Sequence, residues 1–185
     1  MSAPTQPLVE PATSTGEIRL FSLHVDFPAS VHVRWLTGKI IELAGPHWKT
    51  SSETWKIDAL KASDGIRKML TSDAINADVV IVAFSLLAQP EPALIQWLNA
   101  LGAEHISRPT PGVLIALLGN EDSKAQELDE VVKPLMVCSQ QLGRDFIWQW
   151  MGEIRTLDGA WVTGNINTLL ARKIRFSQLR ETNPQ

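Results

Sequence analysis

The sequence has 185 residues, of which 44% are hydrophobic and 20% are charged. This composition excludes a disordered or low-complexity chain, and no apolar run reaches the ~18 residues of a membrane-spanning helix. The 17 basic and 20 acidic residues give a net charge of −3, which excludes a globally basic surface. We therefore expect neither a nucleic-acid nor a membrane partner.

The N-terminal residues 1–16 contain three prolines among small polar residues, and we interpret them as a disordered leader rather than a secretory signal. Cys138 is the single cysteine, which excludes an internal disulfide and a cysteine-based zinc site. A reducing compartment is the simplest setting for such a chain. The sequence therefore predicts a cytoplasmic protein of a bacterium-like cell.

The first strand and helix are predicted at residues 17–44. Glu17–Val25 is largely apolar and ends at Asp26-Phe27-Pro28, which is typical of a buried strand that meets a turn. Ser30 can cap the helix that follows, and Gly45-Pro46 can end it. The apolar residues of that helix recur at helical spacing: Val33, Leu36, Ile40 and Leu43.

The second unit begins with an alternating segment, Glu53–Leu60. Trp55, Ile57 and Ala59 would share one face of a strand whose other face is wet. Ser63 is expected to cap the next helix.

The third and fourth strands are predicted at Ala77–Phe84 and Gly112–Leu118, which are apolar almost throughout. Strands covered on both faces have this composition. A helix opening at Pro90-Glu91-Pro92 lies between them. The helix after the fourth strand either kinks at Pro134 or begins only a few residues before it.

The fifth strand, Arg144–Trp150, alternates again, with Phe146, Trp148 and Trp150 on one side. Strands in which polar and apolar residues alternate are expected at the edges of a sheet, and strands that are apolar throughout are expected at its centre. Strands separated by helices pair in parallel through right-handed crossovers. We predict an α/β domain over residues 17–150, a three-layer, doubly wound, five-stranded parallel sheet of order 2-1-3-4-5.

Residues 151–185 are broken by three glycines, and we interpret them as a C-terminal extension of low order. Asn165–Leu179 can form a short basic amphipathic helix within it, with Ile166, Leu169, Leu170 and Ile174 on its apolar face. Trp161 is a candidate for docking this extension onto the domain.

Ligands of doubly wound sheets bind beyond the carboxyl ends of the strands, where the first and third strands diverge. Three side chains expected there are candidate catalytic residues: His24, Asp26 and Ser85. The rim around them is predicted to contain Phe27, Ser30, Gln89, Asn120 and Glu121.

His24 and Asp26 lie two residues apart on one strand and suit either a metal or acid–base site, or a plain structural hydrogen bond. No third ligand follows at a recognisable spacing, so we expect no metal and no cofactor. Cys138, between Val137 and Ser139 on a helix, is expected to be a buried structural thiol.

The strand number, order and length of residues 17–150 resemble a response-regulator receiver domain. That resemblance implies an acid pair after the first strand, an aspartate that accepts phosphate after the third, and a lysine after the fifth. Here Asp26 is flanked by Val25 and Phe27, the acceptor position falls at Phe84-Ser85, and the fifth strand ends in Gln149-Trp150. The resemblance therefore implies a degenerate receiver that is not phosphorylated.

The architecture also resembles flavodoxin, whose phosphate loop after the first strand is rich in Ser, Thr and Gly. Asp26-Phe27-Pro28-Ala29-Ser30 stands there instead, and its carboxylate disfavours a flavin phosphate. The Ala-Asp-Val-Val-Ile-Val-Ala strand with a following tryptophan-bearing helix is similar to that of bacterial proteins without an assigned activity.

The chain has seven tryptophans and no tyrosine. Trp148, Trp150 and Trp161 are the candidates for a partner surface, or for a cover over the edge of the fifth strand. The sequence predicts a non-catalytic receiver-like binding or protein-interaction module, or a homo-oligomer that assembles through this edge and the C-terminal extension. The alternative is a small enzyme that uses His24 and Asp26 on an unknown small substrate.

Overall fold

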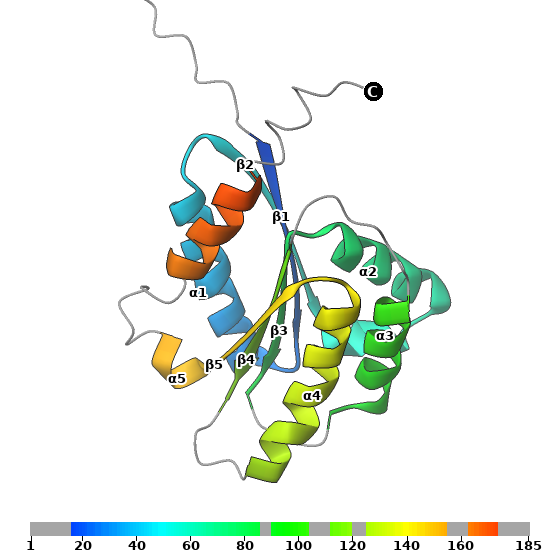
Figure 1. The fold of residues 1–185 in the computed structure, drawn as a ribbon. Coiled ribbons are helices and arrows are strands. Elements are labelled where there is room, and N and C mark those ends of the chain that lie inside the picture. Colours follow the sequence, from blue (N-terminus) through cyan, green and yellow to red (C-terminus); the bar gives the residue numbers. More distant parts are fainter. Residues whose placement is uncertain (1–15, 86–89, 104–111, 120–124, 155–162, 174–185) are drawn as a thin grey trace, which may run out of the picture.

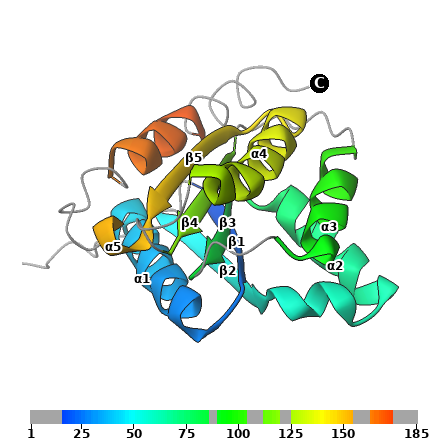
Figure 2. The ribbon, with the colours of Figure 1, turned by 90° about the horizontal axis from the view of Figure 1, so that it is seen from below.

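The computed structural model describes residues 16–85, 90–103, 112–119, 125–154 and 163–173. They form a parallel sheet with helices packed on both faces (Figures 1 and 2). The elements are β1 (Gly16–His24), α1 (Phe27–Ala44), β2 (Trp48–Lys56), the 3₁₀ turn η1 (Ile57–Lys61), α2 (Asp64–Asn76), β3 (Val79–Phe84), α3 (Pro92–Ala103), β4 (Val113–Leu118), α4 (Ala125–Gln141), β5 (Asp145–Trp150) and α5 (Met151–Ile154).

The strand order is β2-β1-β3-β4-β5, and every pairing is parallel, which confirms the predicted doubly wound, flavodoxin-like sheet. All six residues of β3 and all six of β4 are buried. Their apolar composition therefore reflects central positions, as expected. β2 and β5, whose side chains are partly or fully exposed, are the two edge strands.

Successive side chains of each strand point to opposite faces of the sheet, so the protein has two hydrophobic cores, one on each face. Side chains on one face of the sheet pack against η1, α2, α3 and α4, and those on the other face pack against α1, Met151 and residues 163–173. In β3, for example, Val80 and Val82 belong to the first core, whereas Val79 and Ile81 belong to the second. Figures 1 and 2 show the resulting three layers.

The second strand was predicted too late in the chain. It spans Trp48–Lys56, and at Ile57 the chain leaves the sheet for η1. Three residues per 3₁₀ turn place Ile57 and Leu60 on one side, where both are buried in the core beside α2. The alternation of residues 53–60 thus mixes the end of a strand with a short turn.

The cap of the first helix is Asp26 rather than Ser30. Asp26 has an extended backbone, and its Oδ1 accepts a hydrogen bond from the Ala29 N–H at 2.9 Å. Pro28 follows in the first turn, where its missing N–H costs nothing. The Ser30 hydroxyl instead donates to the Phe27 carbonyl at 2.7 Å inside the helix.

The other predicted helix ends are closer to the structure. The Ser63 hydroxyl caps α2 by accepting from the Ile66 N–H at 3.2 Å. Gly45 ends α1 with φ of 72°, a conformation that other residues rarely adopt. Pro134 lies inside α4, nine residues after the start at Ala125, so a start just before Pro134 was wrong.

Residues 163–173 form a helix, and Ile166, Leu169 and Leu170 bury its apolar face beside α1. The expectation of low order is therefore wrong for this part of the C-terminal extension. The helix (orange in Figures 1 and 2) lies beside β5 in Figure 2, on the face of the sheet that α1 also covers. Residues 1–15 of the predicted leader lie outside the described residues.

Within these described ranges, no helix is both long enough and apolar enough to cross a membrane.

Candidate functional site

The carboxyl end of β1 brings two of the candidate residues together. His24 is the last residue of β1, and its Nδ1 lies 3.0 Å from the backbone carbonyl oxygen of Asp26. That carbonyl also accepts from the Ser30 N–H at 3.0 Å. The backbone at Asp26 is therefore held by both the strand end and the first helical turn.

Ser85 reaches the same place from β3, as predicted. Its hydroxyl donates to Oδ2 of Asp26, while Oδ1 of Asp26 caps α1. Gly119, directly after β4, approaches the backbone of Ser85 so closely that a Cβ at Gly119 would overlap the Ser85 carbonyl. The ends of β1, β3 and β4 thus meet around one carboxylate.

Both carboxylate oxygens of Asp26 accept hydrogen bonds from the protein itself, and this decides the chemistry of the cluster. The Ser85 proton points to Asp26, and the described contacts include no hydrogen bond between His24 and Ser85. A serine nucleophile needs a base that takes its proton, with a third group that orients the base. The geometry of this cluster instead suits the positioning of three chain segments.

The remaining predicted rim residues divide into two groups. Phe27 is the first residue of α1 and is 75% exposed, whereas Ser30 is buried with its hydroxyl inside the helix. Gln89, Asn120 and Glu121 lie outside the described residues. Among the residues with a described position, no three His, Cys, Asp or Glu side chains gather closely enough to hold a metal ion.

Ion pairs also lie at this carboxyl edge of the sheet, just after the end of β2. Lys61 pairs with both Asp58 and Glu91, and Asp58 also pairs with Lys56 at 2.5 Å. The hydrogen bond that Lys61 donates to Glu91 raises the pKa of Lys61, and the hydrogen bond that Asp58 accepts from Lys56 lowers the pKa of Asp58. These exposed pairs connect η1 to the start of α3, and exposed pairs of this kind contribute little stability.

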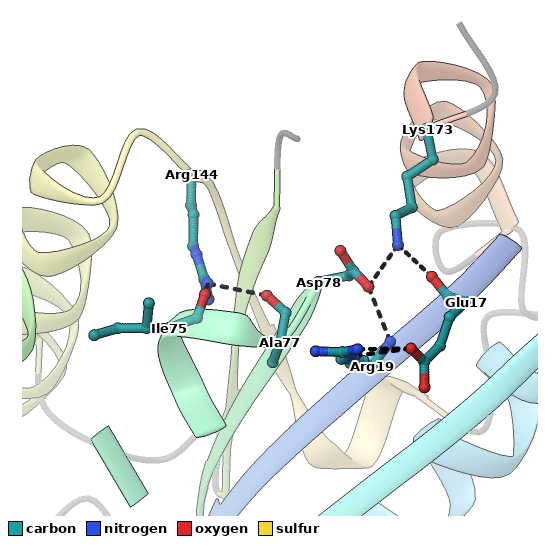
Figure 3. A network of polar contacts seen from close by, with 7 residues as sticks. All are labelled: Glu17, Arg19, Ile75, Ala77, Asp78, Arg144 and Lys173. Carbon is teal, nitrogen blue, oxygen red and sulfur yellow. Dashed lines mark hydrogen bonds and ion pairs between the residues drawn. The ribbon is translucent and has the colours of Figure 1, made fainter. Parts of the chain in front are cut away.

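A second polar cluster, which the sequence analysis missed, lies at the opposite edge of the sheet (Figure 3). The buried carboxylate of Asp78, just before β3, accepts from the Arg19 backbone N–H at 2.9 Å and from Lys173 Nζ at 2.7 Å. Lys173 also donates to the Glu17 carbonyl, and its Nζ lies 5.9 Å from the Trp48 ring centroid. The ion pair joins the C-terminal helix to the beginnings of β1 and β3.

Nearby, Arg19 pairs with Glu17 at 2.8 Å on the exposed side of the same cluster, and this hydrogen bond lowers the pKa of Glu17. A signal for the cluster was present in the sequence. Asp78 is the only charged residue of the apolar run 77–84, and a charge in such a run needs a partner. Nothing in the sequence pointed to Lys173 as that partner.

Arg144 caps the C-terminal end of α2, next to this cluster. Its buried guanidinium donates to the carbonyls of Ala74, Ile75 and Ala77 at 2.8–3.0 Å, and Figure 3 draws Ile75 and Ala77 of these three. Carbonyls at a helix C-terminus lack intrahelical donors and carry partial negative charge, so an arginine there stabilises the helix end. Arg144, Asp78 and Lys173 together hold the amino-terminal edge of the sheet.

The predicted partner surface lies on the β5 edge. Trp148 is 39% exposed, and its ring meets that of Trp150 edge-on at 5.5 Å between centroids. Trp150 and Phe146 are partly buried against the core beside α4. Trp161, the third predicted tryptophan, lies outside the described residues.

Substitution of Asp26 by alanine should lower the free energy of unfolding by about 1–3 kcal/mol, because α1 loses its cap and the Ser85 hydroxyl loses its acceptor. Urea denaturation measures this change. Ser63→Ala is the matched control, since it removes a cap with a single hydrogen bond. Equal losses for the two variants would contradict a role of Asp26 in joining β1 to β3.

Cys138 should resist alkylation in the folded protein. It is buried, and burial raises the pKa of its thiol to about 11, so little thiolate exists at pH 8. Iodoacetamide should label it only in concentrated urea, whereas a cysteine placed at exposed Ser52 in a Cys138→Ala background should react at once. Rapid labelling of native Cys138 would contradict this prediction.

The same pKa shift makes the stability of the folded protein decrease at alkaline pH. The unfolded thiol loses its proton near pH 9 and the folded thiol only near pH 11, so this contribution to stability is complete below pH 9 and is lost as the pH rises between the two values.

Comparison with protein-family models and with curated proteins gave no significant match to this chain.

Proposed function

We propose that this chain is a non-catalytic, receiver-like binding module that works through contacts with another protein. The observation that carries the proposal is the hydrogen bonding of Asp26. A receiver binds a metal and accepts a phosphoryl group through carboxylates at this corner. Here Ser85 stands where the acceptor would be, and both oxygens of Asp26 accept hydrogen bonds from the protein itself.

The binding surface in this proposal is the edge formed by β5 and α4. Trp148 on β5 and Met136 on α4 are both exposed apolar side chains. Gln141 of α4 lies against Gly102 of α3, and Met136 is about 140° from Gln141 around the helix, so it turns away from α3. Exposed tryptophan and methionine are typical of protein-binding surfaces.

The occupant in this proposal is a protein, either a different chain or a second copy of this one. The free thiol of Cys138 suits a reducing compartment, so we place the interaction in the cytoplasm.

Two measurements test the proposal. Acetyl phosphate with Mg²⁺ should leave the intact mass of the protein unchanged, whereas a stoichiometric acyl phosphate would overturn the non-catalytic assignment. Sedimentation velocity over a range of concentrations should reveal self-association or, with a captured protein partner, complex formation.

Trp148→Ala should weaken that association at least about 30-fold, the effect of losing a central interface tryptophan. Phe27→Ala is the control, because Phe27 is a more exposed aromatic residue that lies on α1, on the other face of the sheet. Equal association of the wild-type protein and the Trp148 variant would overturn the assignment of this edge.

A further inference from the structure

A groove of about 710 Å³ runs between α2 and α3, along a part of the molecule that does not include β5. The two helices lie side by side on the same face of the sheet in both views of the fold (Figures 1 and 2). The volume lies within the range of about 300–1,000 Å³ that is common for small-molecule sites. No pattern considered in the sequence pointed to this groove.

The α3 wall of the groove is apolar apart from Gln96, and its two alanines leave room for a ligand. Ala93 and Ala100 flank Trp97 along one side of α3. Trp97 is 3% exposed and fixed in position, since its Nε1 donates to the Thr71 hydroxyl at 3.0 Å and its ring lies 6.1 Å from that of Phe21. The small accessible part of this fixed ring therefore lies at the floor of the groove, beside the two alanines.

The α2 wall is polar and carries an excess of positive charge. Arg67 pairs with Asp64, whereas Lys68 forms no ion pair with any residue in the described ranges. The Gln96 amide, across the groove, likewise forms no hydrogen bond with a described residue. Within the described ranges, an ammonium group and an amide thus line the groove with no partner for their donors.

We propose that the α2–α3 groove binds a small organic anion with a flat aromatic body. The aromatic part lies along Ala93, Trp97 and Ala100, and the carboxylate or sulfonate is held by Lys68 and Gln96. This site is independent of the β5 edge, from which α4 separates it, so failure of either proposal leaves the other intact.

Two related probes test the proposal on the full chain. The first is 8-anilinonaphthalene-1-sulfonate, and the second is N-phenyl-1-naphthylamine, which has the same rings without the sulfonate. Fluorescence titration should give saturable binding of the sulfonate at one site. Lys68→Ala should weaken the sulfonate about 2- to 5-fold, the range of one exposed charge contact, and leave the neutral amine unchanged.

Ala100→Phe should abolish saturable binding of both probes, because Ala100 is exposed and the new ring enters the groove rather than the core. Asn99→Phe is the matched control, since it adds the same ring to α3 at an exposed position outside the groove. Near-UV circular dichroism confirms that each variant keeps its native packing. In protein labelled with 5-fluorotryptophan, the Trp97 resonance, assigned with Trp97→Phe, should shift on binding.

Unchanged binding by Ala100→Phe, or equal loss in Asn99→Phe, would overturn the site. Equal weakening of both probes by Lys68→Ala would overturn the preference for an anion. A Trp97 resonance that does not move while the sulfonate saturates the protein would place the probe elsewhere and would also overturn the proposal.

Discussion

Replacement of Lys173 by methionine is expected to lower the free energy of unfolding by about 3–5 kcal/mol, the usual cost of leaving one partner of a buried ion pair without the other. The Asp78 side chain is 4% exposed and that of Lys173 is 13% exposed, so water cannot replace the missing ammonium group. Methionine keeps most of the aliphatic stem. Urea denaturation, followed by far-UV circular dichroism, measures the change.

Lys133→Met is the matched control, because Lys133 pairs with Asp129 at 2.7 Å on the exposed surface of α4. Its loss should cost less than about 1 kcal/mol. Adding Asp78→Asn to Lys173→Met should restore part of the stability, since the neutral amide can still accept from the Arg19 N–H. A loss no larger than that of the control would contradict the structural role of the Lys173 ion pair.

Substitution of Gly119 by alanine is expected to destabilise the fold by about 3 kcal/mol or more, the upper range for overpacking. The added Cβ would overlap the backbone carbonyl of Ser85, which cannot move aside as a flexible side chain can. Because the Ser85 hydroxyl donates to Asp26, the substitution should also disturb the cap of α1. Thermal unfolding and the amide NMR shifts of residues 24–30 measure the two effects.

Gly38→Ala is the opposite control. Gly38 lies in the middle of α1 with nothing within 4 Å of an added Cβ. Alanine there should raise the stability by about 0.5–1 kcal/mol, because glycine is a poor helix former. If Gly119→Ala were tolerated as well as Gly38→Ala, the close approach of β4 to Ser85 would not constrain this corner.

The two polar edges of the sheet have different structural roles. At the carboxyl edge, Asp26 and Ser85 join β1, α1 and β3 through side-chain hydrogen bonds. At the amino edge, Asp78 and Arg144 attach the C-terminal helix and the end of α2. In both places, buried polar groups are paired with protein atoms, as groups removed from water must be.

The sheet order could be predicted from residues 79–84 and 113–118, since a strand covered on both faces must be apolar on both. Residues 53–60 misled the prediction because Trp55 at the end of the strand and Ile57 at the start of the 3₁₀ turn lie two residues apart, a spacing that is also found within a single strand. The cap of α1 was misplaced because Asp26, Phe27 and Pro28 were interpreted as a turn, although a capping aspartate and an early proline also begin helices.

By itself, the sequence determined the layers of this protein, the parallel order of its strands and the meeting of His24, Asp26 and Ser85 at one edge, because hydrophobic periodicity and topology act through neighbouring segments. Only the tertiary structure decided which partners these polar groups take. Lys173 meets Asp78 across 95 residues, and the α2–α3 groove exists because two alanines on one helix face a polar stripe on another. Such contacts depend on how whole elements pack together, which no local pattern of residues records.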